Sequence, residues 1–131
     1  MRRRTSPRIA AALMATFVLT ALVGGGAAVA AGTDREKERD CSGRSDWKLS
    51  LEKDDGRIEF ELEIDTPRSG QRWGIAIKQN GIRFFKKVRR TDRDGDIEIE
   101  RNRPDRPGTD KFWFKATNRV TGEVCKGTLR I

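Results

Sequence analysis

The sequence predicts an all-β protein, a seven-stranded antiparallel β-sandwich that follows a cleaved N-terminal signal peptide. Two observations predict this fold. From residue 47 to residue 131, apolar side chains alternate with polar ones, which is the period of a strand with one buried face. Turn sequences rich in Gly, Asp and Asn separate the alternating runs at short intervals, as is typical of sandwiches.

The alternation places the strands at residues 47–51, 58–64, 73–77, 82–88, 97–99, 112–116 and 125–131. Asp54-Asp55-Gly56 predicts a tight hairpin turn between the first two strands, and Asn80-Gly81 predicts another between the third and fourth. In the fourth strand the period points Ile82, Phe84 and Val88 inward. The loop around Pro104 and Pro107 then precedes the last two strands.

Residues 1–30 have the pattern of a secretory signal peptide. A basic start is followed by an apolar run from Ile9 to Val23, which is shorter than the ~20 residues of a spanning helix, and by the small residues Ala28-Val29-Ala30. We therefore expect a secreted protein, extracellular or associated with the cell envelope, with no membrane span after cleavage. Residues 31–40 are expected to form a charged, disordered arm, and residues 41–131 the sandwich domain.

Cys41 and Cys125 are the two cysteines of the chain. In an exported protein without a Cys-x-x-Cys motif, they are expected to form a structural disulfide. The arrangement from Cys41 to Ile131 resembles the immunoglobulin-like and fibronectin type III-like sandwiches of small secreted bacterial proteins without assigned activity. The cysteines depart from the antibody pattern, because they flank the first strand and lie in the last one.

Charge divides between the two expected sheets. The full chain carries 28 basic and 20 acidic residues; residues 1–30 contribute four arginines and no acid, which leaves a net charge of +4. If the first, second and fifth strands share a sheet, its outer face carries Glu52, Glu59, Glu61, Glu63, Asp65, Asp96, Glu98 and Glu100. The other sheet then presents a basic outer face, whose candidate binding residues are Arg72, Lys78, Arg83, Phe85, Lys87, Arg89, Lys111, Trp113 and Lys115.

Two aromatic residues, Phe85 and Trp113, fall at outward positions of this basic face. Gly74 and Ala76 leave a shallow floor between them, where a sugar ring or a partner side chain could lie. The alternative is that both aromatics are packing residues, or that the register at Phe84 and Phe85 slips by one.

The sequence favours a non-enzymatic binding or structural module whose partners are anionic polysaccharide, teichoic acid or an acidic protein surface. The acidic sheet of a second copy is one such surface, so weak self-association is expected as well. No nucleic-acid recognition motif is present. The alternative function is a secreted protease inhibitor that presents the loop at residues 102–108, with Arg103 and Arg106.

No catalytic residue, cofactor or metal ligand is predicted. The chain has no His and no Tyr, and both thiols are expected to be oxidised, which leaves carboxylates, lysines and hydroxyls for any catalysis. The segment from Asp92 to Asp96 has its glycine misplaced for a calcium-binding EF-hand and is interpreted as a hairpin turn. The alternating carboxylates of residues 58–65 lie along one strand face and do not form an opposed catalytic pair.

Overall fold

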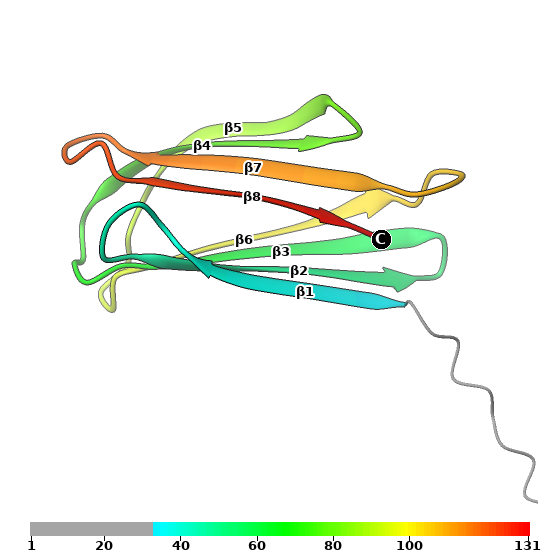
Figure 1. The fold of residues 1–131 in the computed structure, drawn as a ribbon, viewed down its shortest axis with the longest axis horizontal. Helices are drawn as coiled ribbons and strands as arrows, with labels where there is room; N and C mark the ends of the chain where they lie inside the picture. The colour runs from blue at the N-terminus through cyan, green and yellow to red at the C-terminus, as the bar shows by residue number, and fades with distance from the viewer. Residues whose placement is uncertain (1–32) are drawn as a thin grey trace, which may run out of the picture.

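The computed structural model describes residues 33–131, which fold as an antiparallel all-β sandwich of two four-stranded sheets (Figure 1). The strands are β1 (Asp34–Asp40), β2 (Asp46–Asp54), β3 (Arg57–Asp65), β4 (Arg72–Gln79), β5 (Ile82–Arg90), β6 (Asp96–Pro104), β7 (Lys111–Asn118) and β8 (Val124–Arg130). Within this range, no helix is long and apolar enough to cross a membrane. The predicted signal peptide lies outside the described residues.

The strand order is β1-β2-β3-β6 in one sheet and β5-β4-β7-β8 in the other. The predicted division of the strands between two sheets is therefore confirmed. Asp55 and Gly56 make the β2–β3 turn and Asn80 and Gly81 the β4–β5 turn, all four with positive φ, as these tight hairpin turns require. The turn before β6 is not a hairpin turn, since it carries the chain from one sheet to the other.

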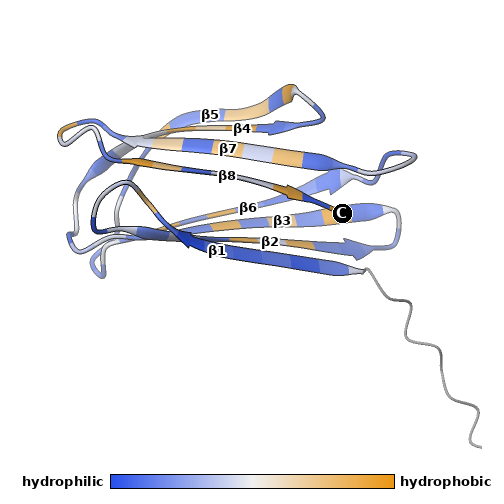
Figure 2. Ribbon diagram, in the orientation of Figure 1, coloured by the Kyte–Doolittle hydropathy of each residue, from blue (hydrophilic) through white to orange (hydrophobic). Residues whose placement is uncertain are grey.

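The prediction of seven strands and a disordered arm was wrong, because Asp34–Asp40 forms the additional strand β1. It pairs with β2 along its whole length, from Asp34 opposite Glu52 to Asp40 opposite Asp46. The segment reads Asp-Arg-Glu-Lys-Glu-Arg-Asp, so that acids and bases alternate with the period of a strand. Figure 2 shows β1 as a uniformly hydrophilic strand, and the prediction missed it because it followed apolar alternation alone.

The core lies between the sheets and is built mainly from the inward rows of β2, β3, β4, β6 and β7, with Phe85 of β5 and Cys125 of β8. Trp47 packs edge-on against Phe114, with ring centroids 4.9 Å apart, and Phe60 packs at 5.5 Å from Phe112. Aromatic pairs of this kind stabilise a fold by about 0.5–1.5 kcal/mol beyond the area they bury. Each of these strands presents its alternate row to solvent, which fixes the two outer faces.

A β-bulge between β4 and β5 changes the face of every residue in the second half of β5. Ile77 pairs with Phe85 and Lys78 with Arg83, so that Phe84 has no partner. Phe84 packs on Phe60 at 5.7 Å and Phe85 is 4 % exposed, which puts two consecutive side chains inside. A bulged strand accommodates one extra residue in this way and then continues with the opposite alternation.

The predicted disulfide between Cys41 and Cys125 is confirmed, with the two Cα atoms 4.4 Å apart. It connects the segment between β1 and β2 to β8, the last strand of the other sheet, and thereby ties the two layers together along one edge. At the same edge, Lys37 on the inward row of β1 donates a hydrogen bond to the carbonyl of Thr128 in β8.

Candidate binding face

The sheet β5-β4-β7-β8 contains no Asp or Glu in any of its four strands. Its outward cationic residues, which we call the basic face, follow from the pairing register and are Arg72, Lys78, Arg83, Lys86, Arg90, Lys111, Lys115, Lys126 and Arg130. The described residues contain two ion pairs, Lys48–Glu36 and Lys53–Asp105, and neither lies on this face. Its cations therefore have no anionic partner within this part of the chain.

The structure brings six of the nine predicted binding residues together on this outer surface: Arg72, Lys78, Arg83, Lys111, Trp113 and Lys115. The expected exposure of Phe85 was wrong, because the bulge turns this side chain into the core. Lys87 and Arg89 follow the bulge and share the inward row with Phe85, at the open edge of the sandwich. Their places on the outer surface are taken by Lys86, Val88 and Arg90.

A groove of about 610 Å³ runs along the basic face above β4. It is lined by Gly74, Ile75, Ala76, Lys86, Lys87, Val88, Trp113, Lys115, Thr117 and Arg119. The walls come from β5 and β7, which are two strand spacings apart, or about 9–10 Å. The floor is flat and open because the outward residues of β4 here, Gly74 and Ala76, have almost no side chain.

The cross-strand register places cations on both sides of the groove floor. Ala76 pairs with Lys86 of β5 on one side and with Lys115 of β7 on the other, and Lys115 pairs in turn with Lys126. One residue pair along, Gly74 lies between Val88 and Thr117. The groove therefore combines ammonium groups with an apolar wall, and Val88 is 42 % exposed.

Trp113 and Arg119 mark the ends of the groove. The Lys78 ammonium lies 5.0 Å from the centre of the half-buried Trp113 ring, a cation–π contact. The Arg119 side chain lies over Gly74, since a Cβ there would come within 2.9 Å of Arg119 Nε. Gly74 therefore gives room to a guanidinium group, so that the groove carries cations at its ends as well as along its walls.

The opposite sheet has the reverse charge, as the sequence predicted. The acidic face is the outer surface of β1-β2-β3-β6, and its carboxylates are Asp34, Glu36, Glu38, Asp40, Asp46, Glu52, Asp54, Glu59, Glu61, Glu63, Asp65, Asp96, Glu98 and Glu100. Lys48 and Arg57 are its two outward bases. Strand β1 adds four carboxylates that the sequence prediction did not place there.

Acidic residues pair directly with acidic residues across β3 and β6. Glu61 faces Glu100 and Glu63 faces Glu98, and carboxylate oxygens of Glu61, Glu98 and Glu100 come within 4.8 Å of one another. The pKa of Glu98 is raised by a hydrogen bond with Glu100 and by the negative charge of that neighbour. Like charges in opposed positions destabilise a sheet. These three carboxylates, of which Glu61 is half-buried and the other two are exposed, lie close enough together to share a cation.

The end of the sheet where Asp46, Asp65 and Asp96 pair across β2, β3 and β6 shows the same effect. The pKa of Asp96 is raised by burial and then by the charges of Asp65 and Asp92, and that of Asp46 by burial and then by Asp65. Asp92 is already engaged, because its carboxylate accepts hydrogen bonds from the backbone NH groups of Asp94 and Asp96. This segment is a turn stabilised by its own backbone.

The predicted inhibitor loop at residues 102–108 is partly strand. Arg103 lies in β6 with its guanidinium 4.3 Å from the centre of the Phe84 ring, and its Nε donates to the side-chain oxygen of Gln79. Burial lowers the pKa of Arg103, and the charges of Arg106 and Arg57 lower it further. Of the two arginines proposed to contact a protease, Arg106 is the exposed one.

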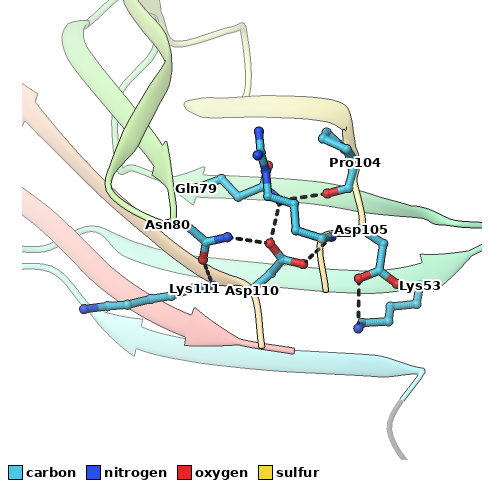
Figure 3. Close-up of polar contacts among 8 residues, drawn as sticks. Lys53, Gln79, Asn80, Pro104, Asp105, Asp110 and Lys111 are labelled. Carbon is cyan, nitrogen blue, oxygen red and sulfur yellow. Dashed lines mark hydrogen bonds and ion pairs between the residues drawn. The ribbon is translucent and has the colours of Figure 1, made fainter. Parts of the chain in front are cut away.

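The chain beyond β6 is fastened by Asp110, which is fully buried (Figure 3). Its carboxylate accepts hydrogen bonds from the side chains of Gln79 at 2.9 Å and Asn80 at 2.7 Å, and from the backbone NH of Arg106 at 3.0 Å. Burial alone would raise the pKa of Asp110, but these hydrogen bonds outweigh it and the pKa is lowered. Asp110 is therefore a structural residue of this loop.

A second hollow, of about 640 Å³, lies at the disulfide end of the sandwich between Arg44, Arg68 and Glu123. The Glu123 carboxylate accepts hydrogen bonds from the backbone NH groups of Gly43 and Ser45 and from the Ser45 hydroxyl. The Glu123 carboxylate thus fixes the segment after Cys41 by hydrogen bonds within the chain. The groove on the basic face is thus the better candidate for a binding site.

Comparison with family models, with curated proteins and with solved structures finds no match to this chain. The class of protein that the fold and this surface define is an all-β two-sheet sandwich with outer faces of opposite charge.

Proposed function

We propose that this protein is a secreted, non-enzymatic binding module whose basic face holds an anionic polymer of the cell envelope or its surroundings. The observation that carries the proposal is the row Lys86, Ala76, Lys115 and Lys126, in which cations border a shallow floor on a sheet without any acid. An array of unpaired cations attracts an anionic chain by summed electrostatic attraction, without a deep pocket.

The groove favours an anionic chain that also has flat or apolar surfaces. Ring faces of a polysaccharide, or the polyol backbone of a teichoic acid, could lie against Val88 and Trp113 while their acidic groups meet Lys86 and Lys115. A floor of Gly74 and Ala76 lets such a chain pass along β4. Open, shallow sites of this kind suit extended polymers better than small substrates, which need enclosure.

The sandwich also supports the immunoglobulin-like assignment. When β2 to β8 are labelled A, B, C, C′, E, F and G in chain order, the sheets become A-B-E and C′-C-F-G. Strand β1 is then an N-terminal addition beside A. We infer that the protein is a variant of this fold, exported by the signal sequence of residues 1–30, in which the outer face of the C′-C-F-G sheet provides the binding surface.

Binding of the purified, disulfide-bonded protein to teichoic acid, to heparin and to uncharged dextran tests the proposal. The test variant is Lys86→Gln/Lys115→Gln, which removes the cations beside the groove floor. Its control, Arg93→Gln/Arg106→Gln, makes the same change in charge at exposed loop positions away from this face.

The wild type and the control should bind the two anionic polymers and not dextran. The groove variant should lose at least tenfold in affinity, and wild-type binding should weaken steeply as salt rises, because exposed charges are screened within about 10 Å at 0.1 M salt. Equal loss of affinity in both variants would indicate attraction by net charge alone and would contradict a site on the basic face.

A further inference from the structure

We propose that the acidic face of one copy docks on the basic face of another, so that the protein stacks head to tail in a salt-sensitive series. The proposal rests on the anion-binding capacity proposed above for the basic face, and adds an independent observation, the uncompensated acidic face. The occupant is thus a second copy of this chain.

The charges of the two faces are not neutralised within one molecule. Lys48 and Glu36 form the single ion pair on the acidic face among the described residues, at 3.4 Å and with side chains that are 43 % and 58 % exposed. The two faces are the outer surfaces of the two layers and point in opposite directions (Figure 1). The nearest source of opposite charge for each face is therefore another molecule.

The dimensions of the two faces are complementary. Opposed carboxylates of β3 and β6, such as Glu61 and Glu100, lie on neighbouring strands about 4.8 Å apart, so that they form a narrow double row. The walls of the groove are about twice as far apart, since Lys86 and Lys115 lie on strands separated by β4. The double row of carboxylates can thus enter between the ammonium groups of Lys86 on one wall and Lys115 on the other.

The expected interface is weak and open. A face of four strands, each seven to nine residues long, measures at most about 30 Å by 19 Å, so that a stack buries up to roughly 1,100 Å² in total. That area is at the low end of specific protein interfaces. Because the two contacting surfaces differ, each added copy leaves one free face of each kind, and the series does not close.

Sedimentation velocity of the complete disulfide-bonded protein tests this proposal with two variants. Glu98→Gln/Glu100→Gln weakens the acidic face and leaves the basic face intact, whereas Lys86→Gln/Lys115→Gln does the opposite. At about 0.01 M ionic strength, where the Debye length is about 30 Å, the mean mass of the wild type should rise with concentration without a plateau. At about 1 M it should be that of a monomer.

Each variant alone should remain monomeric, whereas an equimolar mixture should form a dimer and grow no further, because the remaining two faces are weakened. The control Asp55→Asn/Asp94→Asn, with the same charge change in exposed turns, should assemble like the wild type. A wild type that stays monomeric at low salt would overturn the proposal, as would a mixture that stays monomeric.

Polymer binding by the same proteins separates this proposal from the proposed function. Glu98→Gln/Glu100→Gln should lose self-association and keep its affinity for teichoic acid, because its basic face is unchanged. A wild type that binds teichoic acid but never stacks refutes head-to-tail docking and leaves the polymer site standing. A wild type that stacks but binds no polymer refutes the proposed function alone.

Discussion

Replacing Cys41 and Cys125 with alanine should lower the free energy of unfolding by about 4.5 kcal/mol. The bond joins residues 84 positions apart, and the chain-entropy model for a loop of this length gives that value. Small domains have about 5–15 kcal/mol of stability in total, so the disulfide accounts for a large share. The melting temperature should fall by roughly 20–35 °C for a domain of about a hundred residues.

Urea unfolding followed by tryptophan fluorescence measures the effect, because Trp47 and Trp73 are buried and report on the core. The wild type in reducing agent serves as the control that separates loss of the bond from loss of the buried Cys125 side chain. If the bond acts on the unfolded chain, the unfolding free energy of the variant should also fall more steeply with urea concentration, because its unfolded chain is more expanded without the bond. A loss below about 1 kcal/mol with an unchanged slope would refute this reasoning.

Three further predictions concern single residues. Phe85→Ser should destabilise the fold by about 3–5 kcal/mol, because it removes a buried ring. Trp113→Ser should remain folded and weaken polymer binding. Urea unfolding and polymer-binding assays on both variants check this. The folded-state pKa of Glu98 is raised, so its ionised carboxylate destabilises the folded protein. Glu98→Gln should therefore raise the melting temperature near neutral pH. This gain should disappear in acid, where Glu98 of the wild type becomes protonated. The folded-state pKa of Asp110 is lowered, so its ionised carboxylate stabilises the fold above the ordinary carboxyl range, and this stabilisation is lost as pH falls through the folded-state pKa. Asp110→Asn should therefore lower the free energy of unfolding by about 1–3 kcal/mol at neutral pH and by less in acid. Denaturation curves measured across a pH series check this.

The positions of the sandwich strands and the charge of the two faces could be predicted from the sequence, because both depend on local alternation. Residues such as Leu49 and Phe60 must be buried, and the strand period then directs Ser50 and Glu61 outward. Strand β1 could also have been predicted, since Asp34, Glu36 and Glu38 alternate with bases. Its burial pattern is almost uniformly exposed, however, so that no apolar row marked it as a strand.

The sequence by itself determined the alternation, the hairpin turns and the pairing of its two cysteines, since each depends on neighbouring residues or on elimination. Only the tertiary structure decided which residues line the groove. The bulge opposite Ile77 and Lys78 shifts β5 by one residue, which buries Phe85 and turns Lys86 outward. Arg103 covers the ring of Phe84 from β6, in the other sheet. Because a strand has period two, a single unpaired residue exchanges its faces, and contacts between distant strands decide where that residue lies.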